Sequence, residues 1–194
     1  MDYRAPRSIQ TVRLLLRAPD PARAEAVADY FARNRGHFSP WDPPLAAGHG
    51  QPAFHAASLA EQGSLFDAGT GWVWWLSPRN SPEMVIGSVN LSNIVRGSFH
   101  SCNLGYGIDA LHQGRGLMTE ALAAAIDAAF SPDANLHRIQ AAVRPENARS
   151  IAVVQRLEFR DEGLARDYLY NGGQWRDHRI YARINPSFVL PPGW

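Results

Sequence analysis

The residues best suited to chemistry form a glycine-rich loop between a predicted strand and a predicted helix. The loop reads Gln113-Gly114-Arg115-Gly116. The first amides of a helix have no internal acceptor and lie at the positive end of the helix dipole. Gly114 and Gly116 have no side chain to keep a pyrophosphate from those amides, and Arg115 adds charge at the rim. The loop therefore predicts a phosphate-binding turn, with a plain helix-capping turn as the alternative.

A second pair of polar residues opens a predicted helix nearer the C-terminus. Asn147 and Ser150 follow a strand that ends near Pro145. Residues three apart lie on the same side of a helix, so both side chains can face one cleft. The alternative is structural, with Asn147 as the helix N-cap and Ser150 as an ordinary residue of the first turn.

The composition excludes several kinds of catalytic site. Lys and Arg together number 19, and every one of them is Arg. A Schiff-base lysine, a pyridoxal anchor and a P-loop lysine are therefore excluded. Cys102 is the only cysteine, which excludes an intramolecular disulfide and a cysteine-based zinc site, and we expect it to be a buried strand residue rather than a nucleophile. The 7 His show no metal-ligand spacing, so no metal is expected.

The charge balance and the N-terminus bear on partners and location. With 19 basic against 18 acidic residues, the net charge of +1 gives no reason to expect nucleic acid or an anionic membrane as the main partner. The first residues lack the long apolar run of a signal peptide, and no uncharged apolar stretch reaches about 18 residues. These features predict a cytoplasmic protein without a membrane span.

Apolar periodicity and turn residues predict a mixed α+β sheet flanked by helices. Asp20 is the expected N-cap of the first helix, with Pro21 at its first position. Asn171-Gly172-Gly173 predicts the turn of a C-terminal hairpin. In chain order, the expected elements are a strand (11–17), helices (21–36 and 53–67), strands (71–76, 84–95 and 98–108), a helix (116–130), a strand (139–143), a helix (147–157) and the hairpin strands (164–170 and 174–184).

Some side chains of these elements also have expected positions. Val12 should share the buried face of the first strand with Leu14 and Leu16. The tryptophan-rich segment 72–75 should be core with one exposed ring, and not a stacking platform for nucleic-acid bases. Glycine in the strand segment Gly105-Tyr106-Gly107 indicates a bulge, the close approach of another backbone, or a packing constraint.

The glycine loop and several other blocks resemble a known family. Gln113-Gly114-Arg115-Gly116-Leu117-Met118 is similar to the Gln/Arg-x-x-Gly-x-Gly/Ala signature of the GNAT superfamily of acyl-coenzyme A N-acetyltransferases, and departs from it only at Met118. Further blocks resemble one branch of that superfamily, the ribosomal-protein-alanine N-acetyltransferases of the RimJ type. These blocks are 13–17, 40–41, 93–100, 118–122 and 172–178, so the resemblance covers about residues 11–184.

The resemblance implies a fold, a domain organisation and a cosubstrate. It implies a single GNAT domain over residues 1–194 with its core at about 11–184, built on a mixed, mostly antiparallel sheet that is splayed between its two middle strands. Acetyl-CoA would be the cosubstrate, no metal is implied, and the pantetheine amides would pair with the strand around 106–108 as an added strand does. The residues implied for coenzyme binding are Tyr106, Gly107, Ile108, Gln113, Gly114, Arg115, Gly116, Leu117, Met118 and Asn147.

The resemblance also bears on catalytic roles. Ser150 falls where the branch has a serine near the sulfur that protonates the departing thiolate. The glutamate base of a related enzyme corresponds to Leu169 here, so that role does not carry over. Asp167, two residues earlier and expected on the same strand face, is our predicted base. His100 and Glu120 are rival candidates, and a surface or structural role is the alternative for each of the three.

The implied reaction is direct acetyl transfer without an acyl-enzyme, with backbone N–H groups near residues 102–106 receiving the oxyanion. An α-amino group with a pKa near 8 has a usable neutral fraction at pH 7, so a modest base suffices. The implied acceptor is the N-terminal alanine of a small-subunit ribosomal protein. Two alternatives stay open: a GNAT enzyme acting on a small amine such as a polyamine or an antibiotic, and a ribosome-assembly binding factor for which the coenzyme is only a ligand. The oligomeric state is also left open.

Overall fold

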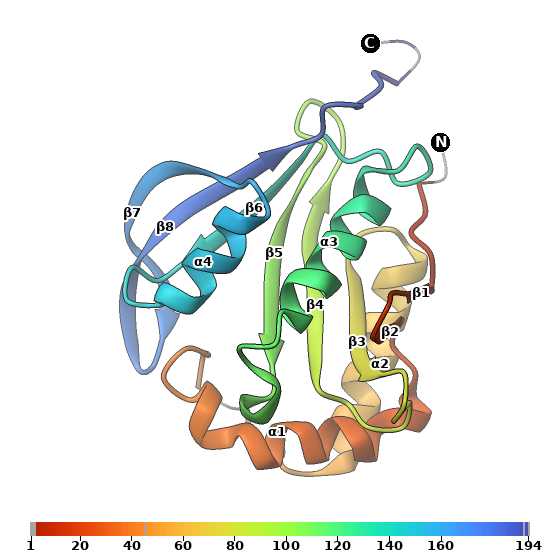
Figure 1. Cartoon of the computed structure of the whole chain (residues 1–194), viewed down its shortest axis with the longest axis vertical. Coiled ribbons are helices and arrows are strands. Elements are labelled where there is room, and N and C mark those ends of the chain that lie inside the picture. The colour runs from red at the N-terminus through yellow and green to blue at the C-terminus, as the bar shows by residue number, and fades with distance from the viewer. Residues whose placement is uncertain (1–2, 45, 192, 194) are drawn as a thin grey trace.

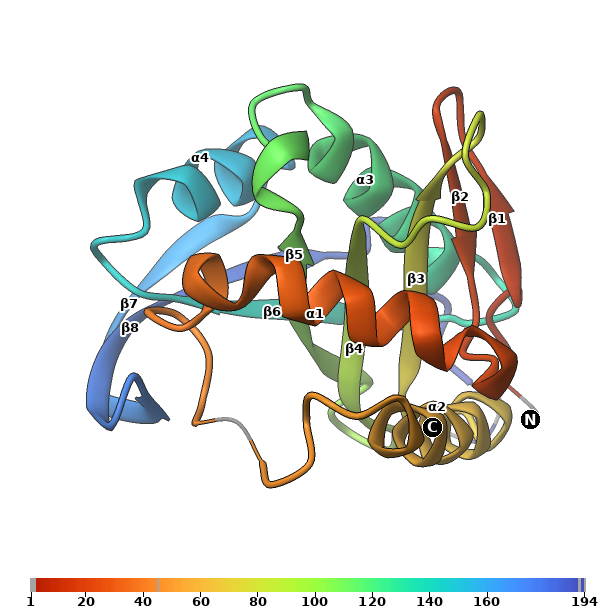
Figure 2. The same cartoon turned by 90° about the horizontal axis from the view of Figure 1, so that it is seen from below.

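A computed structural model describes residues 3–44, 46–191 and 193, and within them the chain forms a sheet of eight strands with helices on both sides (Figure 1). The strand order is β1-β2-β3-β4-β5-β6-β8-β7. Helices α3 and α4 cover one side, here called the front face, and α2 lies on the other side, the back face (Figure 2). The elements are β1 (Ser8–Gln10), β2 (Leu14–Arg17), η1 (Pro21–Arg23), α1 (Ala24–Phe38), α2 (Pro52–Asp67), β3 (Trp72–Pro78), β4 (Gly87–Val95), β5 (Ser101–Ile108), η2 (Ala110–His112), α3 (Leu117–Phe130), β6 (Arg138–Val143), α4 (Ala148–Arg156), β7 (Arg160–Asn171) and β8 (Gln174–Ile184).

The N-terminal region follows the sequence prediction in part. Asp20 caps the start of η1 by accepting a hydrogen bond from the Ala22 N–H (2.9 Å), as predicted. Leu14 and Leu16 are buried, but the prediction for Val12 is wrong, because its side chain is 82% exposed. β1 pairs with β2, so the residues between them form a hairpin turn rather than the start of a strand.

The tryptophans fill both sides of the sheet. Trp72 and Trp74 belong to the large core beneath α3, whereas Trp75 packs with Tyr30 of α1 and Leu59 of α2. The prediction of one exposed ring is wrong, since all three tryptophans are buried. α1 and α2 cover most of the back face of β3, but Val73 stays partly exposed.

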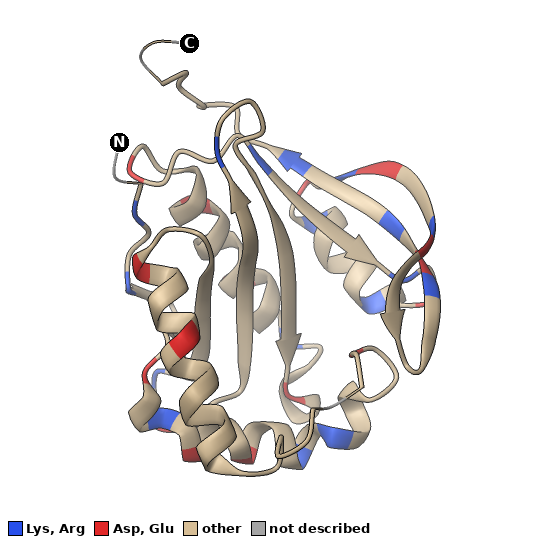
Figure 3. Cartoon of the chain, turned by 180° about the vertical axis from the view of Figure 1, so that it is seen from behind, with Lys and Arg blue, Asp and Glu red and all other residues tan. Residues whose placement is uncertain are grey.

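The middle of the sheet opens between β5 and β6. These parallel strands pair from Ser101 with Arg138 to Leu104 with Ala141. Beyond that point β5 continues along β4 as far as Ile108, while β6 continues along β8, so the two strands part (Figure 3). The other strand pairs described are antiparallel, which confirms the predicted mixed sheet with splayed middle strands. Separated strand edges leave backbone N–H and C=O groups that need partners.

In the described part of the chain, no helix combines the length and apolar character that crossing a membrane requires.

Candidate active site

The glycine-rich loop has the geometry of an anion-binding turn. Gly114 and Gly116 have φ angles of +72° and +73°, in the left-handed region that favours glycine. The Glu120 N–H reaches Gly116 O at 3.1 Å as the first bond of α3. Among the described residues, the amides of 114–119 have no hydrogen-bond acceptor. The side chains of Leu117 and Met118 are buried in the core, so these residues can serve a ligand only through their backbone.

Glu120 fastens this loop to the β1–β2 turn. Its carboxylate accepts hydrogen bonds from Thr11 Oγ1 (2.6 Å) and Arg13 Nε (2.6 Å), and Arg13 also donates to Arg115 O (2.8 Å). Burial favours the neutral acid, but these donors outweigh it, so the pKa of Glu120 lies below its usual value. The carboxylate is therefore committed to a structural ion pair.

A buried acid fixes the other end of the loop. Asp109 is 1% exposed and accepts hydrogen bonds from Arg33 Nε (2.6 Å) and Asn34 Nδ2 (2.9 Å) of α1. Asn34 also accepts from the Ala110 N–H (2.9 Å), and Leu111 N–H donates to Asp109 (2.8 Å). Burial acts to raise the pKa of Asp109, yet these donors lower it well below its ordinary value. The network, which the sequence analysis missed, ties the loop to α1.

A cavity of about 220 Å³ occupies the opening between β5 and β6. Side chains from both faces of the sheet line it, together with the first turn of α4, the β7–β8 hairpin and the loop after α1. The lining residues are Trp41, Asp42, Leu104, Gly105, Tyr106, Ala141, Ala142, Val143, Arg144, Asn147, Ser150, Leu169, Asn171 and His178.

Ser150 and Tyr106 form a pair within this cavity. Tyr106 Oη and Ser150 Oγ lie 2.5 Å apart, and burial raises the pKa of Tyr106 to about 12. Asn147 accepts the Ser150 N–H (3.1 Å) and so is the N-cap of α4, while it also lines the cavity. Arg149 donates to Gln113 Oε1 (2.8 Å), which joins this first turn of α4 to the glycine loop. The two halves of the predicted site are therefore adjacent.

The predicted bases lie elsewhere. Asp167 is exposed on an irregular part of β7, with φ +45° and its N–H bonded to Asp177 Oδ1 (2.9 Å). The register shift between Ala165 and Leu169 interrupts the alternation on which the prediction rested: Leu169 lines the cavity and Asp167 does not. His100 precedes β5 at the end away from the opening, where its ring packs against Phe188 (centroids 5.2 Å apart).

Cys102 is a buried strand residue, as predicted. Its side chain is 2% exposed, and burial raises the pKa of its thiol to about 12. A thiol held protonated in the core is a poor nucleophile. The described residues contain no cluster of His, Cys, Asp and Glu that could hold a metal ion.

Comparison with known proteins identifies the family. Residues 13–160 match a family model described as an acetyltransferase (GNAT) domain. The chain belongs to the GNAT acetyltransferase family. It is 41% identical over 181 residues to the [ribosomal protein uS5]-alanine N-acetyltransferase of Escherichia coli K12, covering 93% of this chain and 92% of that protein.

Solved structures agree with this GNAT assignment. The ribosomal-protein-S5-alanine acetyltransferase of Vibrio fischeri superposes with a TM-score of 0.89 at 34% identity, covering 94% of this chain and 99% of that one. Mycobacterium smegmatis RimJ, solved in complex with CoA-disulfide, gives a TM-score of 0.83 at 27% identity, over 97% of this chain and 88% of that one. The resemblance inferred from the sequence motifs is thus confirmed.

Two titratable residues of this GNAT site were missed by the sequence analysis. Asp42 and His178 both line the cavity from the back face, and His178 is 3% exposed. Asp42 directly follows the block at 40–41 that carried the family resemblance, and His178 is the last residue of the block at 172–178. The sequence motifs are close to both residues, but no local pattern shows that residues so far apart in the chain are neighbours in the fold.

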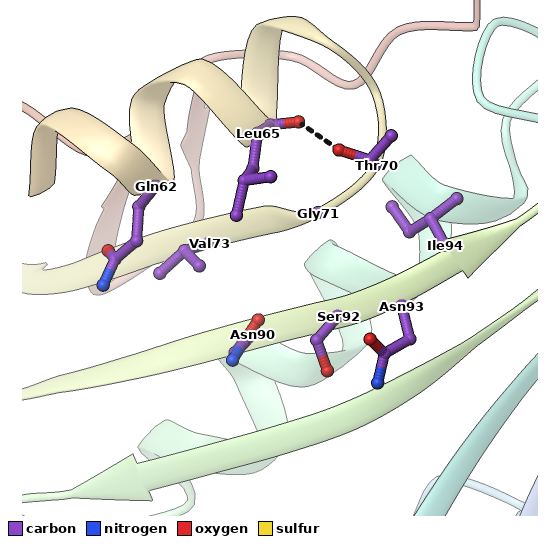
Figure 4. Close-up of a pocket in the computed structure, with 9 residues that line it drawn as sticks. All are labelled: Gln62, Leu65, Thr70, Gly71, Val73, Asn90, Ser92, Asn93 and Ile94. Atoms are coloured by element: carbon purple, nitrogen blue, oxygen red, sulfur yellow. Dashed lines mark hydrogen bonds between the residues drawn. The ribbon is translucent and has the colours of Figure 1, made fainter. Parts of the chain in front are cut away.

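A second hollow, of about 400 Å³, lies on the back face between α2, β3 and β4 (Figure 4). Polar side chains such as Gln62, Asn90 and Ser92 line it together with Leu65 and Val73. None of its lining residues titrates near neutral pH, so it offers no group for proton transfer. Of these two cavities, only the one between β5 and β6 is lined by titratable side chains.

Proposed function

We propose that this GNAT domain transfers the acetyl group of acetyl-CoA to the α-amino group of the N-terminal alanine of a ribosomal protein. The acetyltransferase class follows from the family. The acceptor is inferred from relatives that are named as ribosomal-protein-alanine acetyltransferases. A ribosomal acceptor would place the protein in the cytoplasm.

One observation carries the proposal: the glycine loop and the cavity between β5 and β6 are joined. The Arg149–Gln113 bond of 2.8 Å brings the amides at the start of α3 next to the first turn of α4. A ligand with its diphosphate on those amides could extend its long arm along the unpaired edge of β5, toward Ser150.

The residues at hand fit acetyl-CoA in three parts. The free amides of 114–119 suit the diphosphate. The edge of β5 from Gly105 to Ile108, which β6 no longer pairs, suits the pantetheine amides as an added strand would. Tyr106 and Asn147 line the cavity into which the arm would extend.

The chain's own groups then supply the chemistry at the thioester. Backbone N–H groups of β5 beside the opening would hold the oxyanion. Ser150 would protonate the departing thiolate, and Tyr106, 2.5 Å away and the more acidic hydroxyl, would resupply that proton. Transfer is direct, because Cys102 is buried with a thiol pKa of about 12. None of Asp167, His100 and Glu120 lines the cavity, so we do not propose any of them as the base.

A competition assay tests the proposal. Purified protein and acetyl-CoA are incubated with a peptide that begins with alanine, with the same peptide N-terminally blocked, and with a polyamine and an aminoglycoside antibiotic. We expect acetylation of the free peptide only. Mass spectrometry of ribosomal proteins from cells with and without the gene then identifies the acceptor. Preference for a small amine would support the other enzymatic alternative, and binding of acetyl-CoA without any transfer would support a binding factor.

A further inference from the structure

The acceptor amine must lose a proton before it attacks the thioester. An α-amino group with a pKa near 8 is mostly protonated at pH 7. The back-face wall of the cavity offers two groups able to take that proton, Asp42 and His178. The back surface of β4 and β5, from which an acceptor would arrive on the side opposite α3, carries neither acidic nor basic residues (Figure 3).

The segment that carries Asp42 is fixed at the cavity by contacts on both sides. Arg144 donates to Pro40 O (2.6 Å), and its guanidinium lies over the Trp41 ring at 5.1 Å. Asn171 Nδ2 donates to Trp41 O (2.6 Å), and Gly172 N–H donates to Asp42 O (3.2 Å). The backbone around Asp42 is thereby bound to the end of β6 and to the tip of the β7–β8 hairpin, so the segment that brings Asp42 to the cavity has a defined place.

The surroundings of Asp42 favour the binding of a cationic ligand. Among the described residues no cation pairs with its carboxylate, and burial raises its pKa. The titratable groups facing this region are Tyr30 from α1, whose own pKa is raised by burial and by the charge of Asp42, Tyr106 from β5, His178 from β8, and Arg144 from the end of β6. Arg144 is directed to Pro40 O and to an ion pair with Glu146 (3.4 Å). A half-buried carboxylate without a partner attracts an ammonium group.

We propose that Asp42 binds the ammonium group of the acceptor from the back face and takes its proton as the amine attacks. The N–C bond to the acetyl carbonyl forms and the C–S bond breaks. The ammonium group loses two protons in all. The first moves to the Asp42 carboxylate, and the second, released from the nitrogen once the N–C bond has formed, replaces by way of Tyr106 the proton that Ser150 gives to the thiolate. This role rests on the proposed acetyl transfer and adds the group that prepares the amine.

His178 is the rival for this role, and the geometry favours Asp42. His178 Nδ1 lies 2.9 Å from Arg176 O, so this nitrogen donates and only Nε2 is an acceptor in the neutral ring. A neutral imidazole can accept a proton, but it does not attract an ammonium group by charge. The carboxylate does both.

The pH dependence of kcat/KM with the alanine-starting peptide tests the proposal. In the wild type, a base whose pKa lies below that of the amine gives kcat/KM a plateau between these two pKa values. In Asp42→Asn only the free amine reacts, so kcat/KM should rise about tenfold per pH unit up to about pH 8. At pH 7 we expect a loss of roughly 100-fold, with Asp42→Glu partly restoring the plateau. The acetyl-CoA affinity should stay within about twofold of the wild type, since Asp42 lies on the acceptor side.

Asp127→Asn, an exposed carboxylate on α3, is the matched control and should retain the wild-type profile. The proposal is overturned if Asp42→Asn keeps the plateau of kcat/KM; loss of the plateau in His178→Gln would then assign the role to His178. It is also overturned if Asp42→Asn loses acetyl-CoA affinity in step with its activity. Failure of the wild type to acetylate the peptide contradicts the proposed function instead. In that event the same pH comparison is made with the amine that the wild type accepts.

Discussion

Replacing Asp109 by asparagine probes the network that holds the glycine-rich loop. Asp109 is 1% exposed and receives hydrogen bonds from Arg33, Asn34 and the Leu111 N–H. Breaking a buried ion pair costs about 3–5 kcal/mol. Arg33 keeps its contacts with Asp29 and Val85 O, so we expect the smaller loss of about 2–3 kcal/mol typical of hydrogen bonds to a charged group.

The loss of stability in Asp109→Asn is measurable by thermal unfolding followed by circular dichroism. At about 2–4 °C per kcal/mol for a chain of this size, Tm should fall by roughly 5–10 °C. Asp127→Asn, exposed on α3, should shift Tm by less than about 2 °C. Because the Ala110 N–H is bonded to Asn34, the loosened loop should also raise the KM for acetyl-CoA several-fold while kcat changes little. A Tm for Asp109→Asn equal to that of the control would refute the reasoning.

The difference in stability between the wild type and Asp109→Asn should depend on pH in a definite direction. The pKa of Asp109 is lower in the folded protein than in the unfolded chain. Its stabilising contribution is therefore complete above the unfolded pKa of about 3.9 and is lost as the pH falls through the lower folded value. The stability gap between wild type and Asp109→Asn should be constant from about pH 7 to pH 5 and should narrow only below about pH 4.

Four further substitutions test the site. Gly116→Asp places a carboxylate at the free amides and a side chain at φ +73°, so the KM for acetyl-CoA should rise far more than the KM for the peptide, with equal effects contradicting the placement of the diphosphate. Ser150→Ala should lower kcat by about 10²-fold and Tyr106→Phe by less, as measured by steady-state kinetics; an unchanged kcat in Ser150→Ala would dismiss it as the acid. Cys102→Ala should retain wild-type kcat, because the proposed transfer is direct and does not use Cys102 as a nucleophile; loss of turnover in a folded variant would contradict the proposal.

The sequence predicted what depends on local spacing. Glycines at 114 and 116 after a strand are enough to indicate a turn with free amides, because the conformation they permit and the helix that follows are both local properties. The N-cap at Asp20 and the pair Asn147 and Ser150 were found for the same reason. These predictions needed no knowledge of which strands are neighbours.

What the sequence could not show depends on tertiary pairing. The sequence pattern places Val12 in a strand, but β1 pairs with β2 in the structure, so Val12 lies in the turn between them and is exposed. Asp167 fits a two-residue alternation that the irregular β7–β8 register interrupts. Asp42 reaches the cavity because Asn171 and Gly172 bind its segment across more than half of the chain. No local pattern of residue types carries that information.

Calorimetric titration with acetyl-CoA and with S-acetylpantetheine, which lacks the diphosphate, tests most directly whether the amides at the start of α3 bind the diphosphate. Wild-type protein should bind acetyl-CoA much more tightly than the fragment. Gly116→Asp should remove most of that advantage and leave the affinity for the fragment unchanged. Equal weakening of both ligands in Gly116→Asp, or no heat from acetyl-CoA with the wild type, would contradict the account.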